Sequence, residues 1–219
     1  RIYNLGIFST VEIYPVDSTY TVFLIETFQF TPLPLIEYSE AKGFSYGAGI
    51  AYLNFRGLNE KLISGGMVGE EKVYFISFYN PWVFGNHGSI ESEVYQYSTE
   101  SSNYNFHYQI NGFEFGTGFY IGKEHRYSGE IGFKNYNIDS TKSSVINYKQ
   151  LLGDDYESKY QYLIGKLKYR FDSRDIYIDP TKGEYLSIIF EPRISLNNSP
   201  SYYSLFFTYN KYIHLSNII

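Results

Sequence analysis

The chain has 219 residues and a formal net charge of -5, with 26 Tyr and 18 Phe against one Trp, one Met and no Cys. The negative charge provides no basic stripe to neutralise phosphates, which argues against nucleic acid as a partner. The lack of cysteine excludes disulfides and thiolate metal sites. Abundant tyrosine is typical of surfaces with one apolar and one wet side, such as half-exposed strands, binding faces and membrane interfaces.

The sequence contains no apolar run of about eighteen residues, so it predicts no transmembrane helix, although alternating strands of a barrel would escape this test. The first residues, RIYNLGIF, lack the basic segment and cleavage site of a signal peptide. Because the chain starts without Met and ends on SNII, we expect it to be a fragment of a longer protein.

Residues 1–31 have a different pattern from the rest. Ile2, Tyr3 and Leu5 predict the end of a helix that stops at Gly6. The stretches FSTVEIYPV and TYTVFLIETFQF predict two strands around a turn at Asp17. Residues 31–34 carry two prolines, which cannot donate to a strand ladder, and they predict a linker. We therefore expect one domain at residues 1–31 and another at 32–219.

From residue 35 onward the sequence shows alternating strands and turn signals without a helical period. About ten strands are predicted, at residues 35–39, 43–56, 61–68, 72–82, 89–97, 103–115, 127–138, 157–171, 184–196 and 202–213. Many exceed the five or six residues usual in soluble sheets and approach the roughly nine to eleven that cross a bilayer.

Two strands near the C-terminal end separate apolar from charged residues. The apolar set is Leu163, Leu167, Phe171, Leu186, Ile188 and Phe190, and the charged set is Lys166, Lys168, Arg170, Glu191 and Arg193. Successive side chains on a strand point to opposite sides of the sheet. In a barrel the apolar set would meet lipid and the charged set would face the lumen. There Lys166, Lys168 and Arg170 could pair with Glu191 or Asp172 across strands.

The alternation is sharpest at residues 103–111. Tyr104, Phe106, Tyr108 and Ile110 share one side, and Asn103, Asn105, His107, Gln109 and Asn111 share the other. A soluble sandwich with its polar side in water and a barrel with its polar side lining a wet lumen both produce this pattern. The stretch at 73–84 is apolar on both faces, which fits a barrel less well.

Connection lengths also bear on the choice. The predicted turns at 57–59, 85–88 and 122–126 are short and fall on one end of the sheet, whereas the polar segment 139–156 is long and falls on the other. Short turns at one end and longer loops at the other are typical of outer-membrane barrels. The connection at 172–183 is an exception, because it is long yet falls on the short-turn end.

The candidate chemical motifs do not predict a catalytic, cofactor or metal site. Gly43, Ser45 and Gly47 match G-x-S-x-G, but the following residues continue as a strand, where a nucleophile elbow requires a helix. The four histidines, His87, His107, His125 and His214, lack metal-ligand spacing. Glu91 and Glu93 share a strand face, and we expect them to be solvated charges rather than a catalytic pair.

Three segments resemble one family. The first is a D-x-R-D…P-x-x-G signature between strands, matched by Asp172, Arg174 and Asp175 and then by Asp179, Pro180 and Gly183. The second is an N-P-W strand end, matched by Asn80, Pro81 and Trp82. The third is the stretch RIYNLGIFSTVEI, which is similar to the closing helix and strand of a POTRA domain. In their order along the chain, the three segments resemble the bacterial surface antigen family of outer-membrane barrels, the BamA/TamA type.

The resemblance implies an all-β fold, an antiparallel transmembrane β-barrel of which the chain supplies about ten of about sixteen strands. Residues 1–31 would then be the C-terminal part of a POTRA domain, and residues 32–219 the N-terminal part of the barrel. The connection at 172–183 would fix strand register without carrying chemistry.

The resemblance also implies a non-enzymatic role without cofactors in the bacterial outer membrane. The complete protein would insert or translocate other proteins through a lateral seam formed by Leu35, Ile36, Glu37 and Tyr38, a short strand that follows two prolines. Its partners would be the lipid bilayer, client outer-membrane or secreted proteins, and periplasmic accessory proteins, with no nucleic acid. The alternatives are a barrel that anchors a patatin-like phospholipase, a plain diffusion porin, and a soluble Tyr-rich β-sandwich or carbohydrate-binding module.

Overall fold

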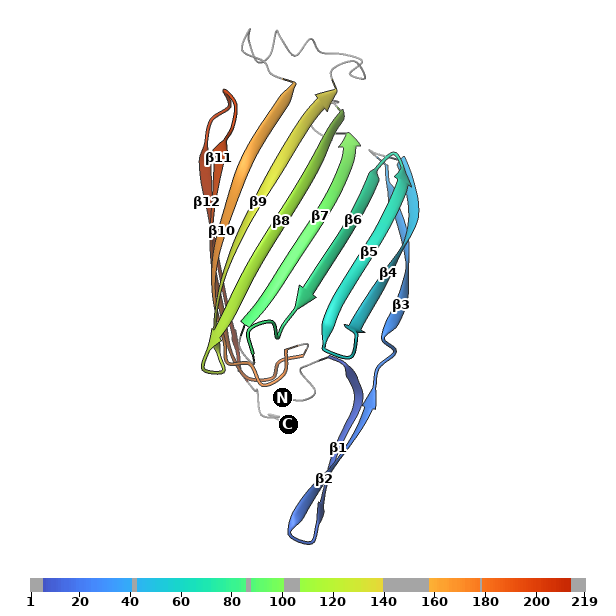
Figure 1. The fold of residues 1–219 in the computed structure, drawn as a ribbon, viewed down its shortest axis with the longest axis vertical. Coiled ribbons are helices and arrows are strands. Elements are labelled where there is room, and N and C mark those ends of the chain that lie inside the picture. Colours follow the sequence, from blue (N-terminus) through green and yellow to red (C-terminus); the bar gives the residue numbers. More distant parts are fainter. Residues whose placement is uncertain are drawn as a thin grey trace, which may run out of the picture.

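The computed structural model describes residues 6–40, 43–85, 88–100, 107–139, 158–177 and 179–213. Every regular element within these residues is a β-strand, and the strands form two antiparallel sheets (Figure 1). In this described part of the chain, no helix is long and apolar enough to span a membrane. The all-β class predicted from the alternating pattern is confirmed.

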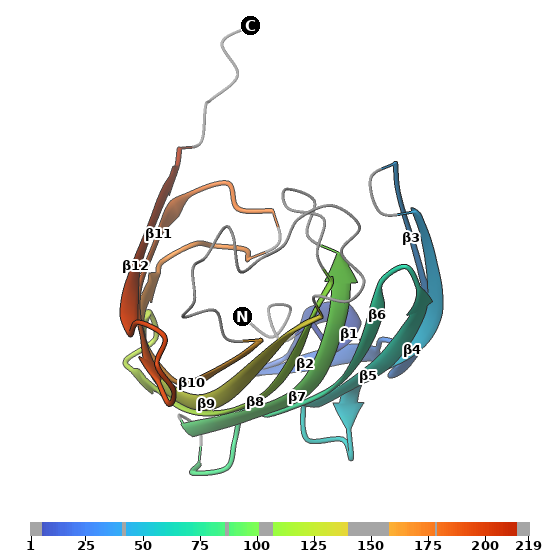
Figure 2. The same cartoon turned by 90° about the horizontal axis from the view of Figure 1, so that it is seen from above.

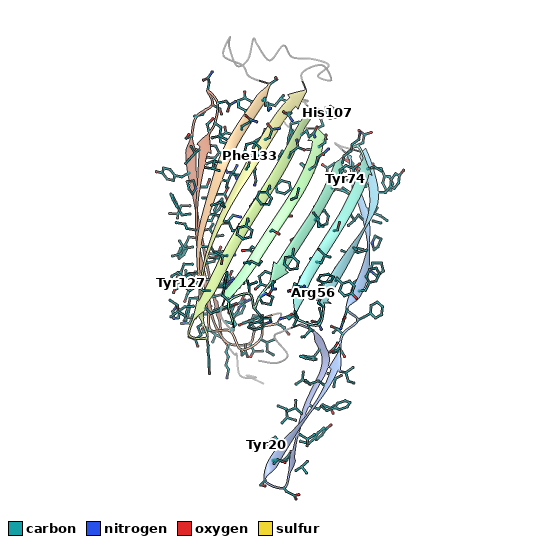
Figure 3. All side chains as sticks on the ribbon, in the orientation of Figure 1. Tyr20, Arg56, Tyr74, His107, Tyr127 and Phe133 are labelled. Atoms are coloured by element: carbon teal, nitrogen blue, oxygen red, sulfur yellow. The ribbon has the colours of Figure 1, made fainter. Side chains whose placement is uncertain are left out.

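The smaller sheet is a hairpin of β1 (Phe8–Val16) and β2 (Thr19–Glu26). Its turn is the predicted one: Asp17 adopts a φ of 52°, and Thr19 Oγ1 donates to the Val16 carbonyl at 3.0 Å. The hairpin extends away from the larger sheet, with Tyr20 at its tip (Figures 1 and 3). The predicted helix end at residues 1–5 lies outside the described residues.

The larger sheet contains ten strands, each hydrogen-bonded to its neighbours in the chain. Their bounds are β3 Phe30–Ser39, β4 Gly43–Phe55, β5 Glu60–Gly69, β6 Lys72–Asn80, β7 Gly88–Glu100, β8 His107–Ile121, β9 His125–Asp139, β10 Lys159–Asp172, β11 Gly183–Ser195 and β12 Tyr202–Tyr212. All ten predicted strands are present. The connections β4–β5, β6–β7, β8–β9 and β10–β11 lie at one end of the sheet, as predicted (Figure 1). The long polar segment beyond β9 lies outside the described residues.

Figure 2 shows that the larger sheet curves into an open trough with β3 and β12 at its two rims. Contacts between strands two apart identify the concave face. Lys166 of β10 contacts Glu114 of β8, and Arg170 of β10 donates to Tyr120 of β8. Side chains converge only on the concave side of a curved sheet, so these residues define the inner face.

The outer face is apolar and uncovered. Leu167 is 62% exposed and Ile131 66% exposed, although both lie in the middle of the sheet. Tyr74, Tyr127 and Phe133 also project from this face (Figure 3). A sandwich would cover such a face with a second sheet, whereas the described strands form one large sheet. The described strands therefore do not form the β-sandwich of that alternative.

Inner-face glycines explain why β8 continues beyond its predicted end. A Cβ at Gly112 of β8 would lie 2.3 Å from Cζ of Tyr95, and one at Gly116 would lie 2.5 Å from Cγ of Glu130. Glycine is a weak strand former, but here each glycine accommodates a large side chain from the neighbouring strand. The predicted end of this strand at residue 115 is therefore too early, and β8 continues to Ile121.

The predicted linker at residues 31–34 is wrong. Pro32 and Pro34 lie inside β3, which pairs with β4 from Phe30 to Ser39. The seam strand is consequently not short. Proline is compatible with a strand at the edge of a sheet, where its missing N–H faces away from the neighbouring strand. The division of the chain between residues 31 and 32 stays a prediction.

At residues 107–111 the two faces are the reverse of those expected for a barrel. Strict alternation along β8 places Tyr108 and Ile110 on the same inner face as Glu114, and Gln109 on the outer face. Tyr108 and Ile110 help to line a hollow of about 530 Å³ that also includes Arg193 and four further tyrosines. Residues 103–106 lie outside the described residues.

Candidate functional site

The predicted seam strand β3 forms one rim of the trough (Figure 2). Leu35 and Glu37 direct their side chains to the inner face, and Ile36 and Tyr38 are 72% and 70% exposed on the outer face. One edge of β3 pairs with β4, and no strand in the described part of the chain pairs with the other edge. A free edge presents backbone N–H and C=O groups that another extended segment can pair with.

The five predicted lumen charges all lie on the inner face, because their register places them beside inner residues of β9 and β10. They are Lys166, Lys168, Arg170, Glu191 and Arg193. Glu191 is buried and the other four are half-buried. Their exposure to a lumen stays a prediction.

The ion pairs differ from the predicted ones. Lys166 Nζ lies 3.2 Å from Glu114 Oε2 and 2.5 Å from Glu130 Oε2, and Lys134 Nζ lies 3.0 Å from Glu114 Oε1. Glu91 and Glu93 line a hollow of about 250 Å³ on the inner face, together with Glu114, Glu130 and Lys166. The predicted partners, Glu191 and Asp172, form ion pairs with other residues instead. Glu191 pairs with Arg193 and Asp172 pairs with Arg174, in each case two residues further along the sequence. The sheet curvature that brings β8 and β10 together cannot be deduced from strand periodicity.

Two arginines of the inner face bind tyrosine hydroxyls. Arg170 Nη2 donates to Tyr120 Oη at 2.7 Å. Arg193 Nε donates to Glu191 Oε1 at 2.7 Å, and its Nη1 donates to Tyr202 Oη at 2.8 Å. The bonds to Tyr120 and Tyr202 connect β10 to β8 and β11 to β12 across the wall. The inner face is a polar, cross-linked surface.

The connection between β10 and β11 is held by its own signature residues. Arg174 forms a two-pronged hydrogen bond with the Asp172 carboxylate, with Nε–Oδ1 and Nη2–Oδ2 distances of 2.8 Å, and stacks 4.7 Å over the Tyr185 ring. Gly183 adopts a φ of 110°, and a Cβ there would lie 2.5 Å from the Ser173 carbonyl oxygen. Asp179 is exposed and Pro180 is half-buried. Asp172 and Arg174 therefore bond to each other within this connection.

Asp175 acts as the anchor of the same connection. Its carboxylate accepts hydrogen bonds from the Thr181 hydroxyl at 2.6 Å, the Thr181 amide at 3.1 Å, the Ile176 amide at 3.0 Å and the Lys182 amide at 3.3 Å. These bonds, that of the Thr181 hydroxyl first, hold the pKa of Asp175 well below its usual range. The side chain therefore bridges both ends of the link as a carboxylate.

Asn80 of the N-P-W motif bonds to Glu60, which forms an ion pair with Arg56. The sequence analysis did not predict this pair. Glu60 is fully buried, and its carboxylate accepts from Arg56 Nε at 2.8 Å, Arg56 Nη2 at 2.6 Å and Asn80 Nδ2 at 2.6 Å. Asn80 Oδ1 in turn accepts from the Trp82 amide at 2.8 Å. Arg56 lies at the lower end of the sheet in Figure 3. Opposite charges at the two ends of the turn at 57–59 were the available signal.

The serine of the G-x-S-x-G match and the described histidines do not form a common site. Ser45 lies within β4, is 1% exposed, and accepts from the Glu71 amide at 2.8 Å. His125 contacts the Tyr169 hydroxyl at 2.9 Å, whereas His107 lies at the opposite end of the sheet (Figure 3). His87 and His214 lie outside the described residues. Across the described residues, no three His, Asp or Glu side chains come together in a way that could hold a metal ion.

Comparison with known proteins finds one matching family and solved structures of similar fold. Residues 54–219 match the Omp85 superfamily domain. The fold is similar to BamA from Haemophilus ducreyi lacking POTRA domains 1–3, with a TM-score of 0.58 and 16% identity over 89% of this chain and 41% of that one. It is also similar to CdiB from Acinetobacter baumannii, with a TM-score of 0.52 and 15% identity over 95% of this chain and 41% of that one. No curated protein matches. The chain spans less than half of either structure.

Proposed function

The chain belongs to the Omp85 superfamily, and we propose that the complete protein inserts client proteins into the bacterial outer membrane, or moves them across it, without catalysing a chemical step. Members of this family are bacterial outer-membrane barrels. The free edge of β3 is the observation that carries the proposal, because it offers a place where an extended client segment can join the wall.

Pairing at this edge requires only exchange of backbone hydrogen bonds. A client strand that adds to β3 satisfies its own N–H and C=O groups before it is surrounded by lipid, where unpaired groups are costly. Ile36 and Tyr38 project outward beside the edge and would contact the lipid-facing side chains of the client. Local thinning of the bilayer beside a weakly paired seam would ease entry.

The lipid bilayer is proposed as the second partner. The outer face exposes Leu163, Leu167 and Phe190, which were predicted to meet lipid, while charged side chains of the same strands lie on the inner face. Charged side chains on the lipid face of a barrel are strongly destabilising near the bilayer midplane. This separation supports a wall that stands in hydrocarbon.

The hairpin of β1 and β2 is proposed as the C-terminal part of a POTRA domain. One of its faces is formed by apolar residues, and Ile13, Val22 and Leu24 are exposed on it. Such a face requires a covering layer, which the remainder of a periplasmic domain would provide. Clients and accessory periplasmic proteins would first contact the protein on this side.

A reversible lock of the seam tests the function. In the complete protein, one cysteine replaces Ile36 and a second is placed opposite it in the closing strand; the absence of native Cys in this chain keeps other disulfides from forming within it. After reconstitution in liposomes, oxidation should abolish insertion of a barrel client, and reduction should restore it.

The matched control joins two strands that are already paired. Tyr169→Cys with Ile188→Cys links directly opposite residues of β10 and β11, and insertion should be unaffected. Equal insertion by the locked seam and this control would rule out exchange at the β3 edge.

A further inference from the structure

The orientation of the backbone along β3 follows from one hydrogen bond. The Leu53 amide of β4 donates to the Gln29 carbonyl at 2.9 Å, in the same register as the β3–β4 ladder. Hydrogen-bonded positions recur at every second residue of an antiparallel pair. The odd-numbered residues of β3 therefore direct their N–H and C=O groups to β4, and the even-numbered residues direct theirs to the free edge.

Both prolines of β3 occupy even-numbered positions. The groups directed to the free edge belong to Phe30, Pro32, Pro34, Ile36 and Tyr38. All five carry a carbonyl, but proline has no N–H, so only three amides remain. The pairing of β3 with β4 continues without a break past both prolines. The loss of donors is thus confined to the edge that faces a partner.

We propose that Pro32 and Pro34 confine consecutive two-way pairing of a client strand to the Ile36–Tyr38 end of β3, so that the Phe30 end, where one isolated amide remains, pairs weakly and releases first. This inference rests on the proposed function, since the partner is the client strand. A client strand opposite Ile36 and Tyr38 can both donate and accept. Opposite the prolines it can donate, but two of its carbonyls find no donor.

The weakly pairing end of β3 lies beside the hairpin. Figure 1 shows that the Phe30 end of β3 adjoins the β1–β2 hairpin, whereas the Tyr38 end lies at the opposite end of the sheet. A partner strand held at the Tyr38 end can therefore separate from β3 beside the hairpin. Unpaired carbonyls in hydrocarbon are unfavourable, which favours local entry of water or displacement of the strand at that end.

Phe30 and Tyr38 provide a matched pair of probe positions, because both are outward-facing aromatic residues at opposite ends of the edge. Each is replaced in turn by a photoreactive phenylalanine analogue in the complete protein, reconstituted in liposomes. The probe is a biotinylated synthetic peptide of about ten residues with strictly alternating Val and Thr. The measured quantity is the yield of cross-linked peptide after illumination.

We expect the yield at Tyr38 to exceed that at Phe30 about tenfold, which is the ratio expected for two missing backbone hydrogen bonds. Pro32→Ala with Pro34→Ala restores both donors and should bring the yield at Phe30 close to that at Tyr38. Pro192→Ala, in β11 and away from the edge, should leave the ratio as it is in the unaltered protein.

Equal yields at the two positions in the unaltered protein would overturn the inference, as would an unchanged ratio after both prolines are replaced. Cross-linking at neither position would also overturn it, because the edge would then accept no added strand. The seam-lock assay reports client insertion independently of the peptide. A failure of the proline inference therefore leaves the proposed function standing, and the two results can be distinguished.

Discussion

Lys166 of β10 reaches past β9 to place its Nζ 3.2 Å from Oε2 of Glu114 on β8. The same ammonium contacts Glu130, so its removal leaves two half-buried carboxylates without this cation. We expect Lys166→Met to lower the free energy of unfolding by about 2 kcal/mol, the range for a hydrogen bond to a charged group. Urea unfolding of the complete protein in detergent micelles measures the change.

Lys168→Met is the matched control for this network. Lys168 lies on the same face of the same strand, and no ion pair involves it among the described residues. Its replacement should change the free energy of unfolding by less than about 0.5 kcal/mol. Equal losses in the two variants would show that the ion pairs of Lys166 contribute nothing specific.

The buried Glu60 carboxylate predicts an asymmetric response at the lower turn. Arg56→Ala removes the cation and leaves a fully buried charge that, within the described residues, keeps the hydrogen bond from Asn80, which should cost about 1–3 kcal/mol. The double variant Arg56→Ala with Glu60→Gln removes that charge and should be more stable than Arg56→Ala alone. Urea unfolding again provides the measurement, and a double variant less stable than the single one would contradict the role assigned to Glu60.

Gly183 should tolerate no side chain. Alanine there combines a φ of 110° with a Cβ placed 2.5 Å from the Ser173 carbonyl oxygen. Gly57 provides the control, because its φ is 74° and no atom lies within 4 Å of a built Cβ. We expect Gly57→Ala to cost about 1 kcal/mol from backbone strain alone, and Gly183→Ala to cost clearly more. Similar thermal unfolding temperatures for the two variants would rule out the close approach.

Asp175 predicts how the β10–β11 connection responds to acid. A carboxyl whose pKa is lowered by folding stabilises the folded form above its unfolded pKa, about 3.9 for Asp, and this contribution is lost as the pH falls through the lower folded pKa. Amide protection in residues 173–177 and 179–182 should be constant from pH 7 to about 5 and decline below about 4. Hydrogen exchange, corrected for intrinsic rates, measures it.

Asp175→Asn should be less protected than the unaltered protein at pH 7, because an amide oxygen accepts these hydrogen bonds less strongly than a carboxylate. Its protection should also lose the decline in acid. A decline of the same size in both proteins would assign the acid response to another carboxyl group.

Periodicity was sufficient to predict the strands and most of their faces. Leu163, Leu167 and Phe190 are outward and Lys166, Arg170 and Arg193 are inward, because side-chain direction in a strand depends only on sequence position. The ends of strands were harder to predict. Gly116 resembles a turn residue in sequence, and only the fold reveals Glu130 packed over it.

Contacts that depend on curvature could not be predicted. Nothing in the spacing of Lys166 and Glu114 along the chain indicates that β8 and β10 approach on one side. The prolines led to a wrong prediction for a related reason. The missing N–H of proline argues against a central strand but allows an edge strand. Residues 31–34 were therefore interpreted as a linker, although they belong to β3.

The prolines of β3 also bear on how two copies of this chain meet. If two β3 edges approached each other, each would present five carbonyls and only three amides, so the shortage of donors would be doubled. Exposed strand edges are common starting points for aggregation, and proline is one of the residues that prevents it. The edge proposed to accept a client strand is consequently a poor template for a second copy of itself.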